Sequence, residues 1–426
     1  MRSSRAYDHV HMDTSSPLPS RLATGDLASA SVTAVLRAID DSRQPDPDRI
    51  AMAYRSDRLL RIDGESPSVW SPYSGFWRAA DGWLRTHGNY PHHASALCRG
   101  LGVPAEATAD DLRSAFAAAS VRESVDRITD AGGLAVEVGR EKPDLDAALR
   151  ARPLVEIRHM GADAPPRSHE SSVPTTPLRG IRVLDLTRVI AGPVCTRTLA
   201  LLGADVLRID PPHLAEPEWQ HFDTGHGKRS AILDARSPQM TELLAGADVV
   251  VLGYRPAALV RLGLSPDVLA DRHPGLIIAQ LSAWGLEHPD RAGFDSLVQA
   301  ESGIAMIESP DGDRPGVLPA QALDHSAGYL LAAAVCETLA RRSRDGGTWH
   351  ISTSLRRVAA ELLGMPRRDE PQPQREIDPE LHSQTFSVAG RTVVTAASAL
   401  PGFSFAAPRV WGGDRPRWRS PRTVRG

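Results

Sequence analysis

The sequence is poor in cysteine and aromatic residues, and it has no long apolar run. Only three cysteines occur in 426 residues, at positions 98, 195 and 336. An odd number of widely separated cysteines argues against a disulfide framework and against a CxxC zinc site, and it is typical of a reducing compartment. The apolar runs are shorter than a membrane span, and the N-terminus lacks the apolar core of a signal peptide. We therefore expect a cytoplasmic protein without a metal site or a membrane partner.

An excess of charge of one sign is also lacking. The formal net charge is -3, so no overall basic field favours nucleic acid, and we expect no nucleic-acid partner. Hydrophobic residues make up 41% and charged residues 24%, which is typical of a globular protein. The length is sufficient for two or three domains.

Two common motifs are missing. No GxSxG occurs, and the first strand-to-helix turn, Leu186–Thr196 (LTRVIAGPVCT), lacks the GxGxxG fingerprint of dinucleotide sites. Gly192 would still allow the backbone to approach a ligand, with a phosphate at the N-terminus of the following helix. Asp210, at the end of the second strand, could bind a ribose or cap a loop. A nucleotide dehydrogenase is therefore a distant alternative.

Composition divides the chain into five segments. Prolines and a loss of periodicity mark the boundaries. We expect a mostly disordered or partly helical segment over 1–50, with one helix at Leu27–Ile39. A small α+β domain over 51–162 follows, which begins with a strand or hairpin at 51–64. A linker over 163–177 then leads to an α/β domain over 178–365, and the chain ends with a linker and a closing strand pair over 366–426.

The segment 178–365 alternates between short apolar runs and patterned helices. Strands buried on both faces are expected at Ile181–Leu186, Asp205–Ile209, Asp248–Leu252 and Leu276–Leu281. Such alternation predicts the fold class α/β, with a doubly wound parallel-sheet (Rossmann-like) domain beside the smaller α+β domain.

Asp324 lies at the start of an apolar helical pattern, which continues through Leu330, Leu331, Ala334 and Val335. Free backbone N–H groups and the helix dipole favour an ionised carboxylate near a helix N-terminus. A carboxylate held there can be a covalent nucleophile, but it can equally be a helix cap, which is the commoner case.

Two polar clusters give weaker evidence for a functional site. His87, His92 and His93 have no carboxylate or cysteine at metal-site spacing, so a solvated loop is favoured over metal ligation. Lys228 and Arg229 lie in Gly225–Asp234 (GHGKRSAILD), where a phosphate contact and a solvated turn are equally expected.

Several stretches resemble the class III CoA-transferases, the CaiB/BaiF family. They are PLRGIRVLDLTRVIAGPVCTRTLALLGADVLRID, GKRSAILD, ADVVVLGYRPAALVRLGL, AGFDSLVQAESG and ALDHSAGYLLAAA, in unbroken order from Pro177 to Leu363. The resemblance implies a CoA-binding α/β domain and an interlocked homodimer. It also implies acyl-CoA and a carboxylic acid as substrates, with no tightly bound cofactor.

The resemblance implies a role for two acidic residues. The nucleophile corresponds to Asp324 in ALDHS, and an earlier acidic motif falls at Asp295, 29 residues before it (324 − 295). The nucleophile would form a mixed anhydride with the acyl group and then an aspartyl-CoA thioester. By resemblance, substrate and CoA contacts fall at Ile190, Ala191, Pro211, Leu233, Asp234, Ala235, Arg236, Gly253, Tyr254, Arg255, Arg261, Phe294 and Asp295.

The chain departs from the family pattern in several places. Ile190 replaces a glutamine of formyl-CoA transferases, Pro211 replaces a basic CoA contact, and Phe294 stands where related racemases have a catalytic histidine. The segment Gly75–Ile157 resembles the family's small domain but precedes the CoA-binding half. A glycine-rich closing loop is not evident. An acyl-CoA racemase or isomerase, and a catalytically weak CoA-binding or scaffold protein, are therefore the alternative functions.

Overall fold

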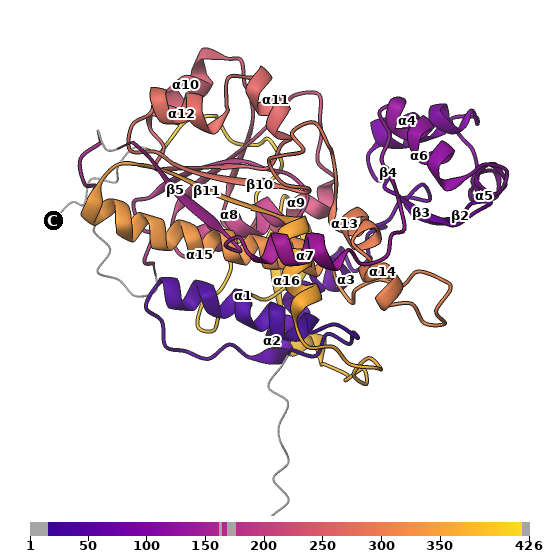
Figure 1. Cartoon of the computed structure of the whole chain (residues 1–426). Helices are drawn as coiled ribbons and strands as arrows, with labels where there is room; N and C mark the ends of the chain where they lie inside the picture. The colour runs from indigo at the N-terminus through magenta and orange to yellow at the C-terminus, as the bar shows by residue number, and fades with distance from the viewer. Residues whose placement is uncertain (1–15, 162–163, 168–175, 420–426) are drawn as a thin grey trace, which may run out of the picture.

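A seven-stranded sheet forms the centre of the molecule (Figure 1). The computed structural model describes residues 16–161, 164–167 and 176–419. The strand order is β5-β11-β10-β9-β6-β7-β8, and every neighbouring pair is parallel except β11 with β5. The predicted α/β fold class with a doubly wound parallel sheet is confirmed.

The strands with continuous apolar runs were predicted correctly. These are β6 (Arg182–Leu186), β7 (Asp205–Asp210), β9 (Val249–Leu252) and β10 (Ile277–Ser282). Two further strands, β8 (Arg229–Ile232) and β11 (Thr348–Ser354), were missed because they mix polar and apolar residues. Periodicity alone does not distinguish such segments from loops.

Helices cover both faces of the sheet (Figure 1). One face packs on α8 (Ala191–Leu201) and α15 (Ala322–Asp345), and the other packs on α10 (Pro238–Ala245), α11 (Pro256–Arg261) and α12 (Pro266–Arg272). Alternate strand residues supply the two cores, as the pleat of a strand requires.

The N-terminal segment, expected to be mostly disordered or partly helical over 1–50, contains a helix in its described part. Residues 1–15 lie outside the described part, but α1 (Thr24–Ala38) packs along α15 with Leu27, Val32 and Val35 buried. The helix expected at Leu27–Ile39 is therefore present within a folded segment. It is stabilised by the large core and not by its own propensity.

The prediction of a strand or hairpin at 51–64 is wrong. Helix α2 (Pro47–Tyr54) and the short α3 (Ser56–Leu59) occupy most of it, and only β1 (Arg61–Ile62) is a strand. The helix begins before the expected segment, because Asp46 caps it and Pro47 occupies its first position.

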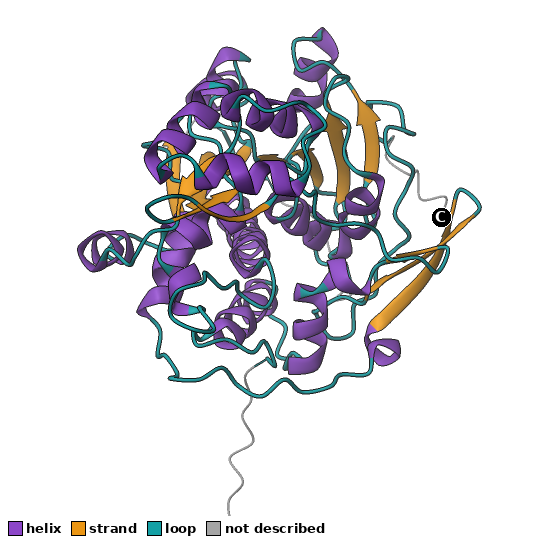
Figure 2. Ribbon diagram, turned by 90° about the vertical axis from the view of Figure 1, so that its right-hand side faces the viewer, coloured by secondary structure: helices purple, strands orange, loops and turns teal. Residues whose placement is uncertain are grey.

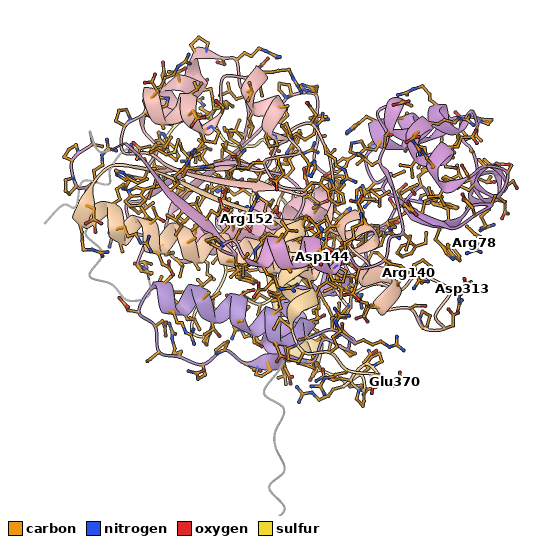
Figure 3. All side chains as sticks on the ribbon, in the orientation of Figure 1. Arg78, Arg140, Asp144, Arg152, Asp313 and Glu370 are labelled. Carbon is orange, nitrogen blue, oxygen red and sulfur yellow. The ribbon has the colours of Figure 1, made fainter. Side chains whose placement is uncertain are left out.

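A smaller lobe is formed by residues 75–137, which we call the small lobe. Its antiparallel strands are β2 (Gly75–Arg78), β3 (Trp83–Thr86) and β4 (Ala135–Glu137), and its helices are α4 (Pro91–Leu101), α5 (Ala109–Ala117) and α6 (Val121–Asp130). Leu84, Leu97 and Phe116 belong to its separate core. Figure 3 shows Arg78 of this lobe near Asp313, and their side chains form an exposed ion pair of 3.7 Å.

The rest of the segment 51–162 belongs to the larger body. Helix α7 (Pro143–Arg150) packs on α16 (Leu355–Gly364), and β5 (Glu156–Gly161) pairs with β11 at the edge of the large sheet. The expected boundaries of a separate domain over 51–162 stay a prediction. The expected linker at 163–177 lies mostly outside the described residues.

The C-terminal segment contains the predicted strand pair. Strands β12 (Ser383–Val388) and β13 (Arg391–Ala396) form a hairpin that pairs with β1 and projects at the edge of the molecule (Figure 2). The remaining short helices are α9 (Glu218–Thr224), α13 (Asp295–Glu301), α14 (Ile304–Ile307) and η1 (Pro379–His382). Among the described helices, none has the length and apolarity that crossing a bilayer requires.

Candidate active site

Asp324 lies in the first turn of α15, but it does not cap the helix. Gln321 is the N-cap residue, and no side chain caps this end. The backbone N–H of Asp324 instead donates to Asp295 Oδ2 at 2.9 Å. Among the described residues, no hydrogen bond to the Asp324 carboxylate is found. The interpretation of Asp324 as a helix cap is therefore wrong.

Asp295 is a supporting residue in the structure. It is 0% exposed and accepts a short hydrogen bond from Gln299 Nε2, while Gln299 Oε1 accepts from the backbone N–H of Leu318 at 2.9 Å. This chain of bonds joins α13 to the start of α15 and fixes the backbone of Asp324. Asp295 lines neither of the two cavities described below, and the direct substrate contact implied by the resemblance stays a prediction.

Burial and like charge raise the proton affinity of this pair of carboxylates. Burial raises the pKa of Asp324 well above its usual range, and the nearby Asp295 raises it further. Burial also raises the pKa of Asp295 to about 6, although the donors from Asp324 and Gln299 oppose that shift. A buried carboxylate without donors is poorly solvated, which makes its ionised form a stronger nucleophile.

A small cavity of about 40 Å³ opens beside this carboxylate, and we call it the Asp324 cavity. Segments far apart in the sequence form its wall. Its lining residues are Tyr54, Ser56, Asp57, Val69, Trp70, His87, Asn89, Val189, Ile190, Trp219, Gln220, Asp223, Phe294, Gln321, Asp324 and His325.

A larger cavity of about 470 Å³ lies at the carboxyl ends of β6, β7 and β9, and we call it the strand-end cavity. Ligands of doubly wound sheets bind at this edge. The predicted contacts that line it are Pro211, Leu233, Asp234, Ala235, Arg236, Gly253, Tyr254, Arg255, Arg261 and Phe294. Val189 and Phe294 line both cavities, which therefore adjoin.

Three predicted contacts lie elsewhere. Ile190 lines only the Asp324 cavity, whereas Ala191 and Asp295 are buried and line neither cavity. Gly192 is buried as well, and a Cβ there would clash with the side chain of Thr187. Close packing of the turn on α8 therefore requires a glycine at this position.

Sequence reasoning missed Glu216, which holds the turn before α8. Val189 has a φ of 73°, a strained value for a β-branched residue, and its N–H donates to Glu216 Oε1 at 3.2 Å. Glu216 also accepts from Arg188 Nε at 2.8 Å and from the hydroxyl of Tyr90 at 3.2 Å. It joins this turn to the small lobe, and no local sequence signal marks it.

Lys228 is neither a phosphate contact nor part of a solvated turn. It is fully buried, and its Nζ donates to Asp185 Oδ2 at 3.1 Å and to the carbonyl of Pro193 at 2.9 Å. Burial lowers the pKa of Lys228 to about 8, although Asp185 opposes the shift. Asp210 is likewise buried and pairs with Arg208 at 2.8 Å, so it contacts no ribose.

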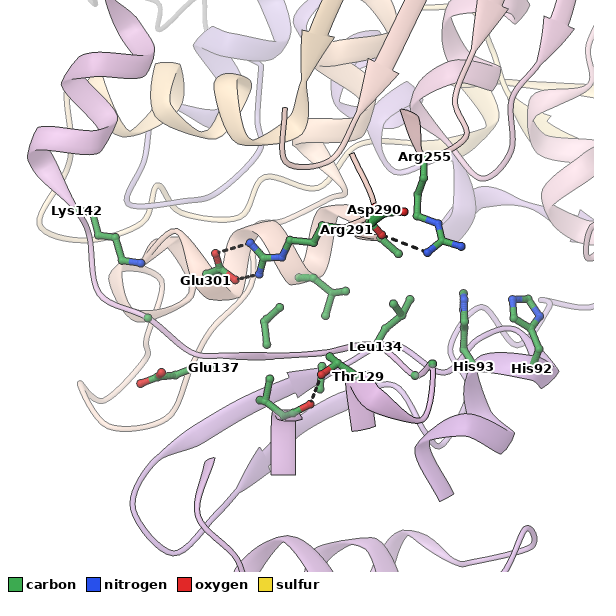
Figure 4. Close-up of a pocket in the computed structure, with 18 of the residues that line it drawn as sticks. His92, His93, Thr129, Leu134, Glu137, Lys142, Arg255, Asp290, Arg291 and Glu301 are labelled. Carbon is green, nitrogen blue, oxygen red and sulfur yellow. Dashed lines mark hydrogen bonds and ion pairs between the residues drawn. The ribbon is translucent and has the colours of Figure 1, made fainter. Parts of the chain in front are cut away.

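Within the described ranges, no group of three or more histidine, cysteine, aspartate or glutamate side chains is arranged to hold a metal ion. His92 and His93 line the strand-end cavity and also a cleft of about 950 Å³ (Figure 4). Arg255, on the opposite side of this cleft, donates to the carbonyl of Asp290 at 3.2 Å. His87 is not in a solvated loop; it is buried in the Asp324 cavity.

Residues 178–407 match the family described as CoA-transferase family III, and the chain belongs to this family. The resemblance predicted from the sequence is confirmed. The match contains Asp295, Asp324 and most of the strand-end cavity. The part of the Asp324 cavity formed by residues 54–89 lies outside it.

Similar proteins of known sequence include a probable fatty acyl-CoA transferase, Rv3272, from Mycobacterium tuberculosis, 34% identical over 48% of this chain and 59% of the relative. A formyl-CoA:oxalate CoA-transferase from Bradyrhizobium diazoefficiens is 28% identical over 46% of this chain and 50% of the relative. A solved CAIB/BAIF family protein from Brucella suis is 26% identical, with a TM-score of 0.42 over 53% of this chain and 67% of that one. The chain thus spans about half of the curated relatives' length.

Proposed function

We propose that this protein moves CoA from an acyl-CoA thioester to a carboxylic acid, with Asp324 as the nucleophile. One observation supports this most strongly. The carboxylate of Asp324 is buried and accepts no hydrogen bond from the described residues. It faces a cavity that adjoins the strand-end cavity. The names of the similar curated proteins, several of them CoA-transferases, agree with this chemistry.

The reaction begins when an Asp324 carboxylate oxygen attacks the thioester carbonyl. The C–S bond breaks, CoA leaves as its thiolate, and a mixed anhydride remains on Asp324. The thiolate then attacks the Asp324 carbonyl of this anhydride, which releases the first acid as its carboxylate and leaves an aspartyl-CoA thioester. The acceptor carboxylate repeats these steps in reverse, so no net proton is consumed.

The strand-end cavity is the proposed CoA site, and acyl-CoA is a substrate and not a tightly bound cofactor. Arg236, Arg255 and Arg261 line it, and guanidinium groups bind phosphates through paired hydrogen bonds. A CoA held there would direct its thioester past Phe294 into the Asp324 cavity, because Phe294 lines both. The homodimer and the cytoplasmic location stay predictions.

Replacing Arg255 with Ala is expected to raise KM for acyl-CoA by about 10- to 100-fold with little change in kcat, since a charge-assisted hydrogen bond contributes about 1.5–3 kcal/mol. Steady-state kinetics at fixed ionic strength checks this. The control is Arg122→Ala, which removes an exposed arginine from α6. An unchanged KM in Arg255→Ala would place the CoA phosphates elsewhere.

The Asp324 cavity should favour short acyl groups without a second carboxylate. One water needs about 10–15 Å³ of such space, so about 40 Å³ holds about three small groups. Its lining residues include Asp57, Asp223 and Asp324 but no lysine or arginine, so a distal carboxylate would be buried among acidic groups without a lining cation to pair with it.

With chain length held constant, we expect kcat/KM for butyryl-CoA to exceed that for succinyl-CoA by about tenfold or more. Competition between the two substrates, resolved by mass spectrometry, measures this ratio. A preference for succinyl-CoA would contradict the proposed charge selection. The Asp57→Asn variant should reduce the ratio, because it removes one of the acidic lining groups.

An acyl-CoA racemase or isomerase is the second candidate, because a titratable ring does lie beside Phe294. The ring of His87 stacks on Phe294 in the Asp324 cavity. However, burial lowers the pKa of His87 to about 3, so it is a weak base at neutral pH. We therefore favour CoA transfer over racemisation as the function.

The transfer assay incubates the protein with butyryl-CoA and isotopically labelled acetate. Formation of labelled acetyl-CoA is the expected result. Loss of α-deuterium from a chiral 2-methylacyl-CoA without transfer would favour the racemase. Acyl-CoA binding with neither reaction would favour a CoA-binding or scaffold protein.

A further inference from the structure

We propose that His87 donates a hydrogen bond to the thioester oxygen that becomes negative when Asp324 attacks. This inference rests on the proposed transferase function and deepens it. His87 lies outside the residues that match the family, so the match gives it no role. Its position and its surroundings support the assignment.

The imidazole of His87 is held in the wall of the Asp324 cavity, against Phe294, which lines both cavities. His87 follows β3, and its backbone N–H donates to the carbonyl of Leu134 at 3.1 Å. Its ring stacks on that of Phe294, with 3.9 Å between centroids and 14° between planes. Trp70 and His87 form an edge-to-face pair with 6.1 Å between ring centroids, and His87 is only 5% exposed.

Stacking on Phe294 places the ring beside the path that we propose for the thioester. Phe294 lines both cavities, so a thioester that passes from the strand-end cavity to Asp324 passes Phe294. Asp324 reaches the Asp324 cavity from α15, and His87 reaches it from the small lobe. A nucleophile and a donor from separate elements can therefore act on the same carbonyl group.

The ring is neutral and has hydrogen-bonding capacity available. Burial is the main cause that lowers the pKa of His87 to about 3, and the nearby His93 and Arg85 lower it further. At neutral pH the ring therefore has one N–H donor and one nitrogen lone pair. Its Nδ1 is buried without a partner among the described residues. A buried polar atom without a partner costs free energy, which a bound substrate can recover.

Two other polar groups of the cavity are less suited to this role. Asn89 is already engaged, because its Nδ2 donates to the carbonyl of Val69 at 3.0 Å and its Oδ1 accepts from Ser74 Oγ at 2.7 Å. His325 also has a buried Nδ1 without a partner among the described residues, but it follows Asp324 on the same helix, and its ring stacks on Tyr54 with 5.0 Å between centroids. No lysine or arginine lines the cavity to stabilise an oxyanion.

No proton is transferred in this step. Attack moves the carbonyl π-electrons onto oxygen, and the His87 N–H bond remains intact while it donates to that oxygen. When the tetrahedral intermediate collapses, the electrons return, the C–S bond breaks and the thiolate leaves. Removing one donor from an oxyanion site lowers the rate by about 10²–10³-fold.

The test measures single-turnover release of CoA thiol from butyryl-CoA, acetyl-CoA or succinyl-CoA in the presence of hydroxylamine. We expect His87→Ala to lower this rate by about 10²-fold or more, with the Kd for acyl-CoA within about threefold of the wild type. His87→Gln, which retains a donor, should recover part of the loss. The matched control is His350→Ala, which removes another buried imidazole, bonded to Gln280 at 3.2 Å in the sheet.

The outcomes separate this inference from the proposed function. If the wild type modifies Asp324 and His87→Ala is no slower than His350→Ala, the assignment of His87 is overturned and the transferase proposal stands. If His87→Gln is as slow as His87→Ala while both bind acyl-CoA normally, a donor role is also overturned. If the wild type releases no thiol with any of the three thioesters, the proposed function fails and the assignment fails with it.

Discussion

Replacing Asp324 with Asn should lower CoA transfer by about 10⁴-fold or more and at the same time stabilise the protein at neutral pH. The loss of activity is expected because the neutral amide cannot form the anhydride. The gain in stability is expected because the buried carboxylate lacks donors among the described residues and lies near Asp295.

The sign of the stability change follows from proton linkage. Because the pKa of Asp324 is raised in the folded protein, the folded state binds the proton more tightly than the unfolded chain. Stability is therefore lost as the pH rises from the unfolded value, about 3.9, through the raised folded value. Asn bears no charge and avoids this loss.

Thermal unfolding of Asp324→Asn and wild type at several pH values, together with transfer kinetics, measures both effects. We expect the melting temperature of the variant to exceed that of the wild type increasingly as the pH rises. The control is Asp267→Asn, which removes an exposed acid from the first turn of another helix, α12. Activity within tenfold of the wild type would exclude Asp324 as the nucleophile.

Replacing Glu216 with Ala should destabilise the fold by about 3–5 kcal/mol, the range for a broken buried ion pair. Glu216 is fully buried, and its Oε2 lies 2.8 Å from Arg188 Nε and 3.1 Å from Arg208 Nη2. Although burial opposes ionisation, these guanidinium groups hold the pKa of Glu216 below its usual value. Truncation would leave two buried cations without their shared partner.

Denaturant unfolding measures this loss, and the control is Glu218→Ala. Glu218 is two residues away, is exposed and pairs with Arg391 at 2.7 Å, so its removal should cost about 0–1 kcal/mol. Equal losses in the two variants would contradict the role given to Glu216. The strained Val189 should also relax in Glu216→Ala, with a higher KM for acyl-CoA.

The sequence was informative wherever a local pattern determines the structure. Continuous apolar runs predicted β6, β7, β9 and β10, because strands buried on both faces need apolar residues throughout. Asp324 could be placed near a helix N-terminus by the same kind of local reasoning. The resemblance supplied its proposed role.

The wall of the Asp324 cavity could not be predicted, because it depends on contacts between distant segments. Tyr54, Trp70 and His87 reach the cavity from three different parts of the chain. Lys228 was misinterpreted for a related reason, since its partner Asp185 is 43 residues away. Local composition is similar for a solvated lysine and for one that becomes buried against a carboxylate.

The most direct test of the proposed mechanism is to trap the covalent intermediate. The protein is incubated with short acyl-CoAs and hydroxylamine, and the modified residues are mapped by mass spectrometry with Asp324→Ala as the control. We predict a hydroxamate at Asp324 that is absent from the variant. Modification at another residue, or no modification although acyl-CoA binds, would contradict the assignment of Asp324 as the nucleophile.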